Sequence, residues 1–549
     1  MLGQLHCGFS REKEKGRILK KLTAALALAL ALTCSASASA VEFGANDDTG
    51  KYLAGGSASY FGQMAAAGLR QNVMTVKWDP AAPMTIPDKA FLDAAVPVAQ
   101  AAGIKVVFAL YGARPTTFTG DGGSAEAFGA WVGQVARTYP AVKTFIVGNE
   151  PNQPRFWRPQ FDAGGRQASA AAFGAVLAAG YDALKAVDGA NQVAGVGLSP
   201  RGNDRPRAVS NVSTSPVRFL TALGAWYRAS GRTLPLMDAL SFHPYPNANT
   251  DRLSNGYAWP NIGLVNADRL KQAIQDAFRG TSHPTVRSGL KLFYDELGWQ
   301  VDTNGHVSYA GVENVVVTTE AKQAEIYGQI PGLVACDAAI SAVNLFGFVD
   351  EGDRGAGFQA GLLRKDGTPR PSLSTFRDAI AAGCTRGQVG WSPAKGVVGA
   401  RAKFNDSSPK PARQTAWNAS ATAAEDAHAR LGLFKVKSQT KKRCAPGKGT
   451  ASHKLILESE FEVKAGYTPL LQLKKKALVT GCYVFALTLE AAMNEDRRST
   501  YLSRAFLAGP AEKLTAKAKK AEQKAKAKKL EQGKPAKKGN GKKDEAGQK

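Results

Sequence analysis

The sequence contains few cysteines for its length, six in 549 residues, and none of them has the spacing of zinc ligands. It also lacks a glycine-rich phosphate loop after its first strand-like run, residues 41–47, where a nucleotide-binding open sheet would have one. Its longest apolar run, near the N-terminus, is short for a comfortable membrane span. These absences argue against a zinc module, a nucleotide-binding fold and a membrane-embedded chain, and the length predicts one large domain with at least one smaller unit.

The N-terminal segment has the three parts of a secretory signal peptide. Basic Arg17, Lys20 and Lys21 precede the apolar run "LTAALALALAL", and a stretch of small residues ends at Ala40. We therefore expect residues 1–40 to be a signal peptide cleaved near Ala40, with an uncleaved anchor as the alternative. Cleavage would give a secreted or cell-surface protein without a stable membrane span.

Four cysteines remain after such a cleavage, and export would place them in an oxidising compartment. They are Cys336, Cys384, Cys444 and Cys482. Four cysteines in such a compartment predict two disulfides. Their order along the chain suggests that Cys336 pairs with Cys384 and Cys444 with Cys482, although three connectivities are open.

The formal net charge of +26 is unevenly spread, because residues 511–549 consist mainly of Lys, Ala, Gly, Glu and Gln. With almost no large apolar side chains, this segment cannot build a core, and we expect a disordered basic tail. Its charge fits attachment to an anionic cell-wall or surface polymer, with a solvated tail as the plainer alternative. Nucleic acid is a weaker candidate partner, because the tail lacks interleaved aromatic residues.

Between residues 41 and 385, apolar β-branched runs alternate with Ala-rich helical stretches, which is the pattern of repeated βα units. Eight runs can be counted: 41–47, 73–79, 105–111, 144–150, 192–199, 239–246, 291–299 and 342–351. Eight parallel strands close a barrel, so the sequence predicts an α/β protein with a (β/α)₈ TIM barrel over residues 41–385. A doubly wound open sheet is the alternative.

The chain after the barrel has a different pattern. Residues 386–432 are poorly patterned and rich in Ala, Ser and Pro, and we expect a linker there. Residues 433–510 contain short runs that alternate apolar and polar side chains, which predicts a small β-sandwich-like module.

Acidic side chains close several of the strand-like runs, where a barrel presents its functional groups. Glu150 ends the fourth run in "GNEPN", next to Asn149, and Glu296 ends the seventh in "YDELGW". Two carboxylates facing each other across a barrel mouth can cleave a glycosidic bond, because one protonates the leaving oxygen and the other attacks the anomeric carbon. Surface or salt-bridged acids are the alternative. Asp295 should point to the opposite face of its strand and be structural.

Together with "SFHPYP" at the sixth run, these motifs make residues 41–385 resemble glycoside hydrolase clan A, the retaining (β/α)₈ glycosidases, and most nearly the bacterial family 39 and family 5 enzymes. The resemblance implies that Glu150 is the acid/base with Asn149 as its companion, and that Glu296 is the nucleophile. It further implies that His243 lines the sugar subsite and that Tyr245 hydrogen-bonds the nucleophile.

The sequence departs from the pattern of that clan in three ways. Gly148 stands where many relatives carry a bulky residue, which implies a more open floor. Lys77 ends the second run without the arginine that often braces the nucleophile. Phe346 and Phe348 replace the frequent sugar-stacking tryptophan of the eighth run.

Further substrate contacts are expected from aromatic and polar residues near the strand ends, because sugar rings present apolar faces. These candidates are Trp78, Tyr111, Asn152, Trp157, Trp259 and Trp299, with ordinary packing as the alternative for each aromatic residue. The loop after the fifth run carries Arg201, Arg205 and Arg207, which fit an acidic glycan or a solvated surface.

The sequence thus predicts a secreted glycosidase (EC 3.2.1.-) that cleaves a β-linked poly- or oligosaccharide by double displacement. No metal or organic cofactor is implied. A catalytically silent glycan-binding or cell-wall protein on the same barrel is an alternative, and so is a transglycosylase. A phosphate-handling barrel is less favoured because no phosphate loop is found.

Overall fold

The computed structural model of the protein describes residues 41–53, 57–404, 416–436, 438–440, 443–444, 454–474, 478 and 481–508. The expected signal peptide (1–40) and basic tail (511–549) lie outside the described residues. The chain forms two compact units, the first ending at Ala394 and the second beginning at Lys395.

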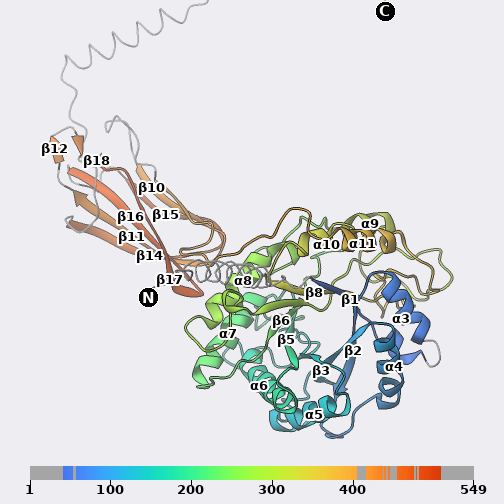
Figure 1. Ribbon diagram of the computed structural model, residues 1–549. Helices are drawn as coiled ribbons and strands as arrows, with labels where there is room; N and C mark the ends of the chain where they lie inside the picture. The colour runs from blue at the N-terminus through green and yellow to red at the C-terminus, as the bar shows by residue number, and fades with distance from the viewer. Residues whose placement is uncertain are drawn as a thin grey trace, which may run out of the picture. The chain divides into compact units, whose positions relative to one another are not determined.

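The first unit is built on eight strands that pair in parallel and close into a barrel in chain order (Figure 1). The strands are β1 (Glu42–Asn46), β2 (Gln71–Trp78), β3 (Lys105–Gly112), β4 (Thr144–Val147), β5 (Gln192–Leu198), β6 (Ala239–Phe242), β7 (Lys291–Tyr294) and β8 (Ile340–Phe346). Pairing of β1 with β8, from Glu42 opposite Ala342 to Asn46 opposite Phe346, closes the ring. Each predicted run contains one strand, and the (β/α)₈ prediction is confirmed.

Helices cover the outside of the barrel (Figure 1). They are α2 (Thr49–Tyr52), α3 (Ser57–Ala66), α4 (Lys89–Ala101), α5 (Ala125–Thr138), α6 (Ser169–Val187), α7 (Pro216–Ala229), α8 (Ala267–Phe278), α9 (Glu320–Tyr327), α10 (Ile330–Val334) and α11 (Pro371–Ala382), with 3₁₀ turns η1 (Leu264–Asn266) and η2 (Val286–Ser288). Within the described residues, α6 alone is long and apolar enough to cross a membrane. Its residues Phe173, Leu177 and Leu184 are buried, as expected of a barrel helix.

The barrel interior is filled by side chains. A buried cluster there comprises Val73, Val107, Ala109, Ile146, Ala194, Phe293 and Ala342. Because the centre is packed, groups that act on a ligand have to lie at an end of the barrel, where the strands run into loops.

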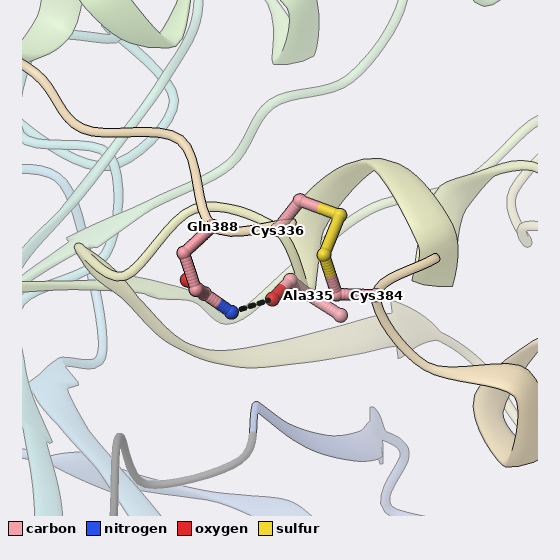
Figure 2. Close-up of a disulfide and its surroundings, with 4 residues drawn as sticks. All are labelled: Ala335, Cys336, Cys384 and Gln388. Carbon is pink, nitrogen blue, oxygen red and sulfur yellow. Dashed lines mark hydrogen bonds between the residues drawn. A yellow bond between two sulfur atoms is a disulfide. The ribbon is translucent and has the colours of Figure 1, made fainter. Parts of the chain in front are cut away.

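A disulfide between Cys336 and Cys384 ties the segment after α11 to the turn before β8 (Figure 2). Gln388 donates a hydrogen bond to the Ala335 carbonyl at 2.9 Å, and the Val389 amide donates to the Cys336 carbonyl at 2.6 Å. The segment that follows α11 therefore packs against the turn before β8. The second unit contains the disulfide between Cys444 and Cys482, so both expected pairings are confirmed.

The second unit consists mainly of two antiparallel sheets. One has the order β15 (Gly466–Lys474), β10 (Ala416–Ala423), β9 (Arg401–Phe404). The other has the order β14 (Lys454–Val463), β11 (Ala427–Val436), β16 (Gly481–Ala491), β17 (Asn494–Leu502), and β18 (Phe506–Ala508) also pairs with β16; a small sheet joins β12 (Ser438–Thr440) and β13 (Arg443–Cys444). One core cluster contains Ala421 and Leu470 from the first sheet and Leu431 and Leu487 from the second. This shared core confirms the β-sandwich-like prediction.

The structure differs from the linker expected over residues 386–432. Strands β9 and β10 and the first half of β11 lie in that range. The buried apolar side chains described in β10 are those of the alanines Ala419, Ala421 and Ala423. A strand whose inward face is alanine has weak hydrophobic alternation, so its composition resembles that of a linker.

Candidate active site

The chain turns sharply where β4 ends. Gly148 has a φ of 107°, and a Cβ there would lie 2.5 Å from the ring of Phe173 and 2.8 Å from the Val196 carbonyl oxygen. Only glycine fits this position. The more open floor expected at Gly148 is therefore wrong, because Phe173 of α6 fills the space that a larger side chain would take.

Glu150 is held in a left-handed backbone conformation, with a φ of 42°. Its amide donates a 2.7 Å hydrogen bond to the carbonyl of Gly197 in β5. There β5 shifts register between Gly195 and Leu198, and Val196 and Gly197 both have positive φ. Such irregularities re-aim neighbouring side chains, and strained backbone of this kind gathers at functional sites. This irregularity in β5, which sequence patterns did not indicate, fixes the direction of Glu150.

Glu296 follows the end of β7, and its side chain is 14% exposed. One oxygen accepts a 3.0 Å hydrogen bond from the Tyr245 hydroxyl, and the other faces the Asn46 amide nitrogen at 3.4 Å. The contact expected from Tyr245 is thus present. The arginine that often braces the nucleophile from the second strand is absent, and Asn46 at the end of β1 contacts Glu296 instead. Lys77 of β2 is exposed, and its ammonium lies 5.9 Å from the centre of the Tyr111 ring.

His243 joins the two glutamates. Its ring is fully buried, and Nδ1 lies 3.1 Å from Glu150 Oε1 and 3.4 Å from Glu296 Oε2. Its other nitrogen, Nε2, lies 3.1 Å from Asp295 Oδ2. Asp295 in turn accepts a 2.6 Å hydrogen bond from Ser241. Asp295, which we expected to be structural on the opposite face, therefore orients the histidine between the catalytic candidates.

The contacts of His243 require a proton on each of its ring nitrogens. Both ring nitrogens of His243 face carboxylate oxygens, whereas a neutral imidazole has a single N–H to donate. Burial lowers the pKa of His243, but the charges of Asp295, Glu296 and Glu150 outweigh burial and raise that pKa well above its usual range. An imidazolium at this position satisfies all three acids.

Burial also raises the pKa of Glu296, to about 7; the charges of Asp295 and Glu150 add to this rise and the charge of His243 opposes it. A carboxyl with a pKa near 7 exchanges its proton in the range where an enzyme works. The site can therefore keep one proton next to a second carboxylate, which is the condition for paired acid and base chemistry.

Three further predicted residues lie around this group. Asn149 is half-buried and lines a cavity of about 20 Å³ together with Tyr111. Burial and the charge of Glu296 raise the pKa of Tyr111, which places its hydroxyl within electrostatic reach of that carboxylate. Trp259 is half-buried in the loop after β6, with the guanidinium of Arg269 lying 5.9 Å from its ring centre.

The other three tryptophans expected to stack on sugars are core residues. Trp78 and Trp157 are 0% and 4% exposed. Both rings stack on the ring of Phe118, with centroid distances of 5.5 and 5.3 Å. Trp299 is 2% exposed, and its indole N–H donates to the Asp251 carbonyl at 3.2 Å. Buried rings present no face to a ligand, so these three predictions are wrong.

Asn152 is a structural residue instead of a substrate contact. Its side chain is fully buried; its amide nitrogen donates to the carbonyls of Ser199 and Thr214, and its oxygen accepts the Ser199 amide at 3.0 Å. Asn152 thereby fastens the turn after β4 to the loop after β5. Among the described residues, no group of three or more His, Cys, Asp or Glu side chains is arranged to hold a metal ion.

No family model and no curated protein matches the chain. Among solved structures, a family 39 glycoside hydrolase from Bacteroides cellulosilyticus WH2 is 15% identical, with a TM-score of 0.44 and coverage of 78% of this chain and 80% of its own. A GH5_18 structure from Streptomyces cattleya in complex with GlcNAc is 15% identical, with a TM-score of 0.44 and coverage of 66% and 84%. Xylanase 10B from Thermotoga maritima is 13% identical, with a TM-score of 0.40 and coverage of 63% and 97%. At these values, the likenesses establish neither family membership nor chemistry for this chain.

Proposed function

We propose that this protein is a retaining glycoside hydrolase that cleaves a β-linked poly- or oligosaccharide. One observation carries the proposal: Glu150 and Glu296, from the ends of β4 and β7, both lie within 3.4 Å of the same nitrogen of His243. Two carboxyl groups that share one neighbour are close together. This closeness suits the separation of about 5–5.5 Å in retaining glycosidases better than the roughly 6.5–9.5 Å of inverting ones.

In the proposed reaction, Glu296 attacks the anomeric carbon while Glu150 gives its proton to the leaving oxygen. The bond from the anomeric carbon to the leaving oxygen breaks as the bond to Glu296 forms. Glu150 then takes a proton from water, whose oxygen displaces Glu296 and releases the sugar with its anomeric configuration retained. The hydroxyl of Tyr245 and the amide of Asn46 hold Glu296 in the direction of attack.

We also propose that the protein acts outside the cell. The two disulfides of the described residues support this location, because such bonds persist in oxidising compartments. The signal peptide over residues 1–40 and the attachment of the basic tail, 511–549, to an anionic polymer stay predictions.

The first experiment compares the protein with its Glu296→Gln variant on a panel of β-linked plant and bacterial glycans. We expect the release of reducing ends to fall at least about 10³-fold in the variant, since the nucleophile is lost. Glu351→Gln is the matched control, because Glu351 follows β8 and its carboxylate accepts only the Phe358 amide among the described residues. This control should keep its activity.

The stereochemistry of the first product, followed by NMR, tests the mechanism separately. The first-formed reducing sugar should be the β anomer. An α anomer would mean inversion, and equal turnover by the protein and its Glu296→Gln variant would rule out the assigned nucleophile.

A further inference from the structure

Arg201 is held beside the candidate active site by contacts to two neighbouring loops. Its main-chain carbonyl accepts a hydrogen bond from Gln153, which lies three residues after Glu150. Its guanidinium donates to the Asn247 carbonyl at 3.2 Å, two residues after Tyr245. Arg201 thus bridges the segment that carries the proposed acid and the segment that carries the partner of the nucleophile.

The guanidinium of Arg201 has no acidic partner in the part of the chain that the structure describes. Arg114, at the end of β3, shows the contrasting case, because it pairs with Asp79 at 2.9 Å and with Asp121 at 2.7 Å. A positioned arginine without a carboxylate is a ready binding site for an anion, since its planar fork matches carboxylate geometry.

Tyr257 adds a second unpartnered donor on the same wall. The residue is 9% exposed, and its buried hydroxyl has no hydrogen-bond partner among the described residues. Its backbone is fixed by a 2.7 Å bond from its amide to the side chain of Asn266 and by a 2.9 Å bond from Arg269 to its carbonyl. The hydroxyl is therefore held in place, and buried polar groups of this kind normally have a partner.

The hydroxyl of Tyr257 is within electrostatic range of both Arg201 and Glu150. Burial raises its pKa to about 12, the charge of Arg201 opposes that rise, and the charges of Asp251 and Glu150 add to it. The oxygens of Asp251 are occupied by the Ala248 amide and the Asn255 side chain. Asp251 is therefore not arranged as the partner of Arg201.

The loops that carry Arg201 and Tyr257 form one wall. The Gly202 amide donates to the side chain of Asn261 at 2.9 Å, and the Ile262 amide donates to the Pro200 carbonyl at 2.9 Å. These bonds fasten the loop after β5 to the loop after β6. The loop segments that carry Arg201 and Tyr257 are therefore held together.

Two other cations without acidic partners among the described residues lie near Tyr111. The pKa of Tyr111 responds to the charges of both Glu296 and Arg155, so Arg155 is within electrostatic reach of the site. Lys77 lies over the ring of Tyr111. Neither cation forms an ion pair with a described acid. Positive charge near the carboxyl pair favours an anionic polymer and speeds its encounter.

We propose that Arg201 and Tyr257 bind the carboxylate of a uronate unit next to the cleaved bond, so that the substrate is a uronate-bearing glycan; this inference rests on the proposed glycosidase function. A carboxylate accepts from both arms of a guanidinium and from a phenol at once. A neutral sugar would leave the charge of Arg201 without a partner beside a partly buried site.

The test uses β-linked oligosaccharides that contain glucuronate, the same oligosaccharides with their carboxylates reduced to primary alcohols, and neutral oligosaccharides that carry sulfate esters. We expect kcat/KM of the unmodified protein to be roughly 10–100-fold higher for the uronate form than for the reduced form. This preference should disappear in Arg201→Gln and shrink in Tyr257→Phe. It should persist in Arg207→Gln, the matched control, because Arg207, exposed like Arg201 and in the same loop, makes no hydrogen bond to the segments after Glu150 or Tyr245 in the part of the chain that the structure describes.

Binding to the Glu296→Gln protein, measured by calorimetry, separates this inference from the proposed function. A preference for the uronate over the reduced form that Arg201→Gln abolishes supports the subsite, whether or not the unmodified protein turns the glycan over. Equal binding of uronate and reduced forms, stronger binding of the sulfated form, or a preference unchanged in Arg201→Gln would each overturn it. Loss of turnover alone bears only on the glycosidase proposal.

Discussion

Two pairs of acids close strands of the same barrel, and the structure uses them in opposite ways. Asp47, after β1, accepts the amides of Phe348 and Val349 at 2.8 and 3.0 Å and so fastens the start of the barrel to its end. Asp350, after β8, is fully buried and binds Arg370, with one contact at 2.7 Å. By contrast, Glu150 and Glu296 face a histidine, a tyrosine and each other.

The difference between the pairs lies in the number of strong donors around each carboxylate. Asp350 also accepts from the Tyr309 hydroxyl and the Gly361 amide, so fixed donors meet both of its oxygens. Glu296 has the hydroxyl of Tyr245, a long contact to Asn46 and the shared contact to His243. Burial, with the charges of its acidic neighbours, raises its pKa to about 7. A strand-end acid is thus available for chemistry where its donors are few and its neighbours are also acids.

The sharpest test of the comparison separates the two members of the reactive pair, and it has the largest expected effect. Glu150→Gln should lower kcat/KM on natural glycans at least about 10³-fold. It should slow the first step much less on aryl glycosides with acidic phenol leaving groups, because such groups depart without a proton donor. Glu296→Gln should lose both activities. Equal losses of the Glu150→Gln variant on both substrate types would contradict the acid role of Glu150.

The structural pair should show the reverse behaviour. Asp350→Asn leaves Arg370 as a buried charge whose remaining acidic partner is Glu320, at 3.1 Å. We expect the free energy of unfolding of the barrel to fall by about 3–5 kcal/mol, measured by urea denaturation followed by tryptophan fluorescence. Glu351→Gln, at the next residue, should cost less than about 1 kcal/mol. An Asp350→Asn protein of unchanged stability would show that the hydrogen bonds and ion pair of Asp350 do not stabilise the fold.

The sequence could predict the barrel and both proposed catalytic glutamates because these depend on short-range signals. Strand-like runs repeat eight times, and Glu150, His243, Tyr245 and Glu296 each follow one of them directly. Strand ends of a closed barrel meet at one rim, so position along a run translates into position in space.

Other parts of the site depend on contacts between distant residues, and the sequence could not supply them. Whether Trp78 or Trp299 faces solvent is decided by rings such as Phe118 and Tyr327, which are far away along the chain. The register shift in β5 that aims Glu150 arises between strands. The strands before residue 433 could not be recognised from the sequence because most of their core-facing residues are alanine.

A smaller effect should follow from removing the donor to the nucleophile. Tyr245→Phe deletes the 3.0 Å hydrogen bond to Glu296 and keeps the ring that packs against Phe358 at 5.6 Å. We expect kcat to fall roughly tenfold with little change in KM, because one hydrogen bond to a charged group is lost. Tyr309→Phe is the matched control, since it removes the equivalent bond to Asp350 and should change stability instead of kcat. A fall in KM alone would contradict the positioning role of Tyr245.

A last effect concerns the stability that the buried carboxyl group of Glu296 costs the protein. The folded pKa of Glu296, about 7, lies above its usual 4.5, so the protonated form favours folding, and this contribution is lost as the pH rises through about 7. Glu296→Gln cannot ionise and should therefore unfold at a higher temperature than the unmodified protein at pH 8. The gain should correspond to on the order of 2 kcal/mol and should vanish near pH 4.5.

Glu126→Gln is the control of opposite sign, because a backbone hydrogen bond and the Ser124 side chain lower the pKa of that exposed acid. Its replacement should therefore lower stability at pH 8. Melting temperatures at pH 8 and pH 4.5 check both variants, and a Glu296→Gln protein that melts earlier at pH 8 would mean that the ionised form of Glu296 is stabilised in the fold.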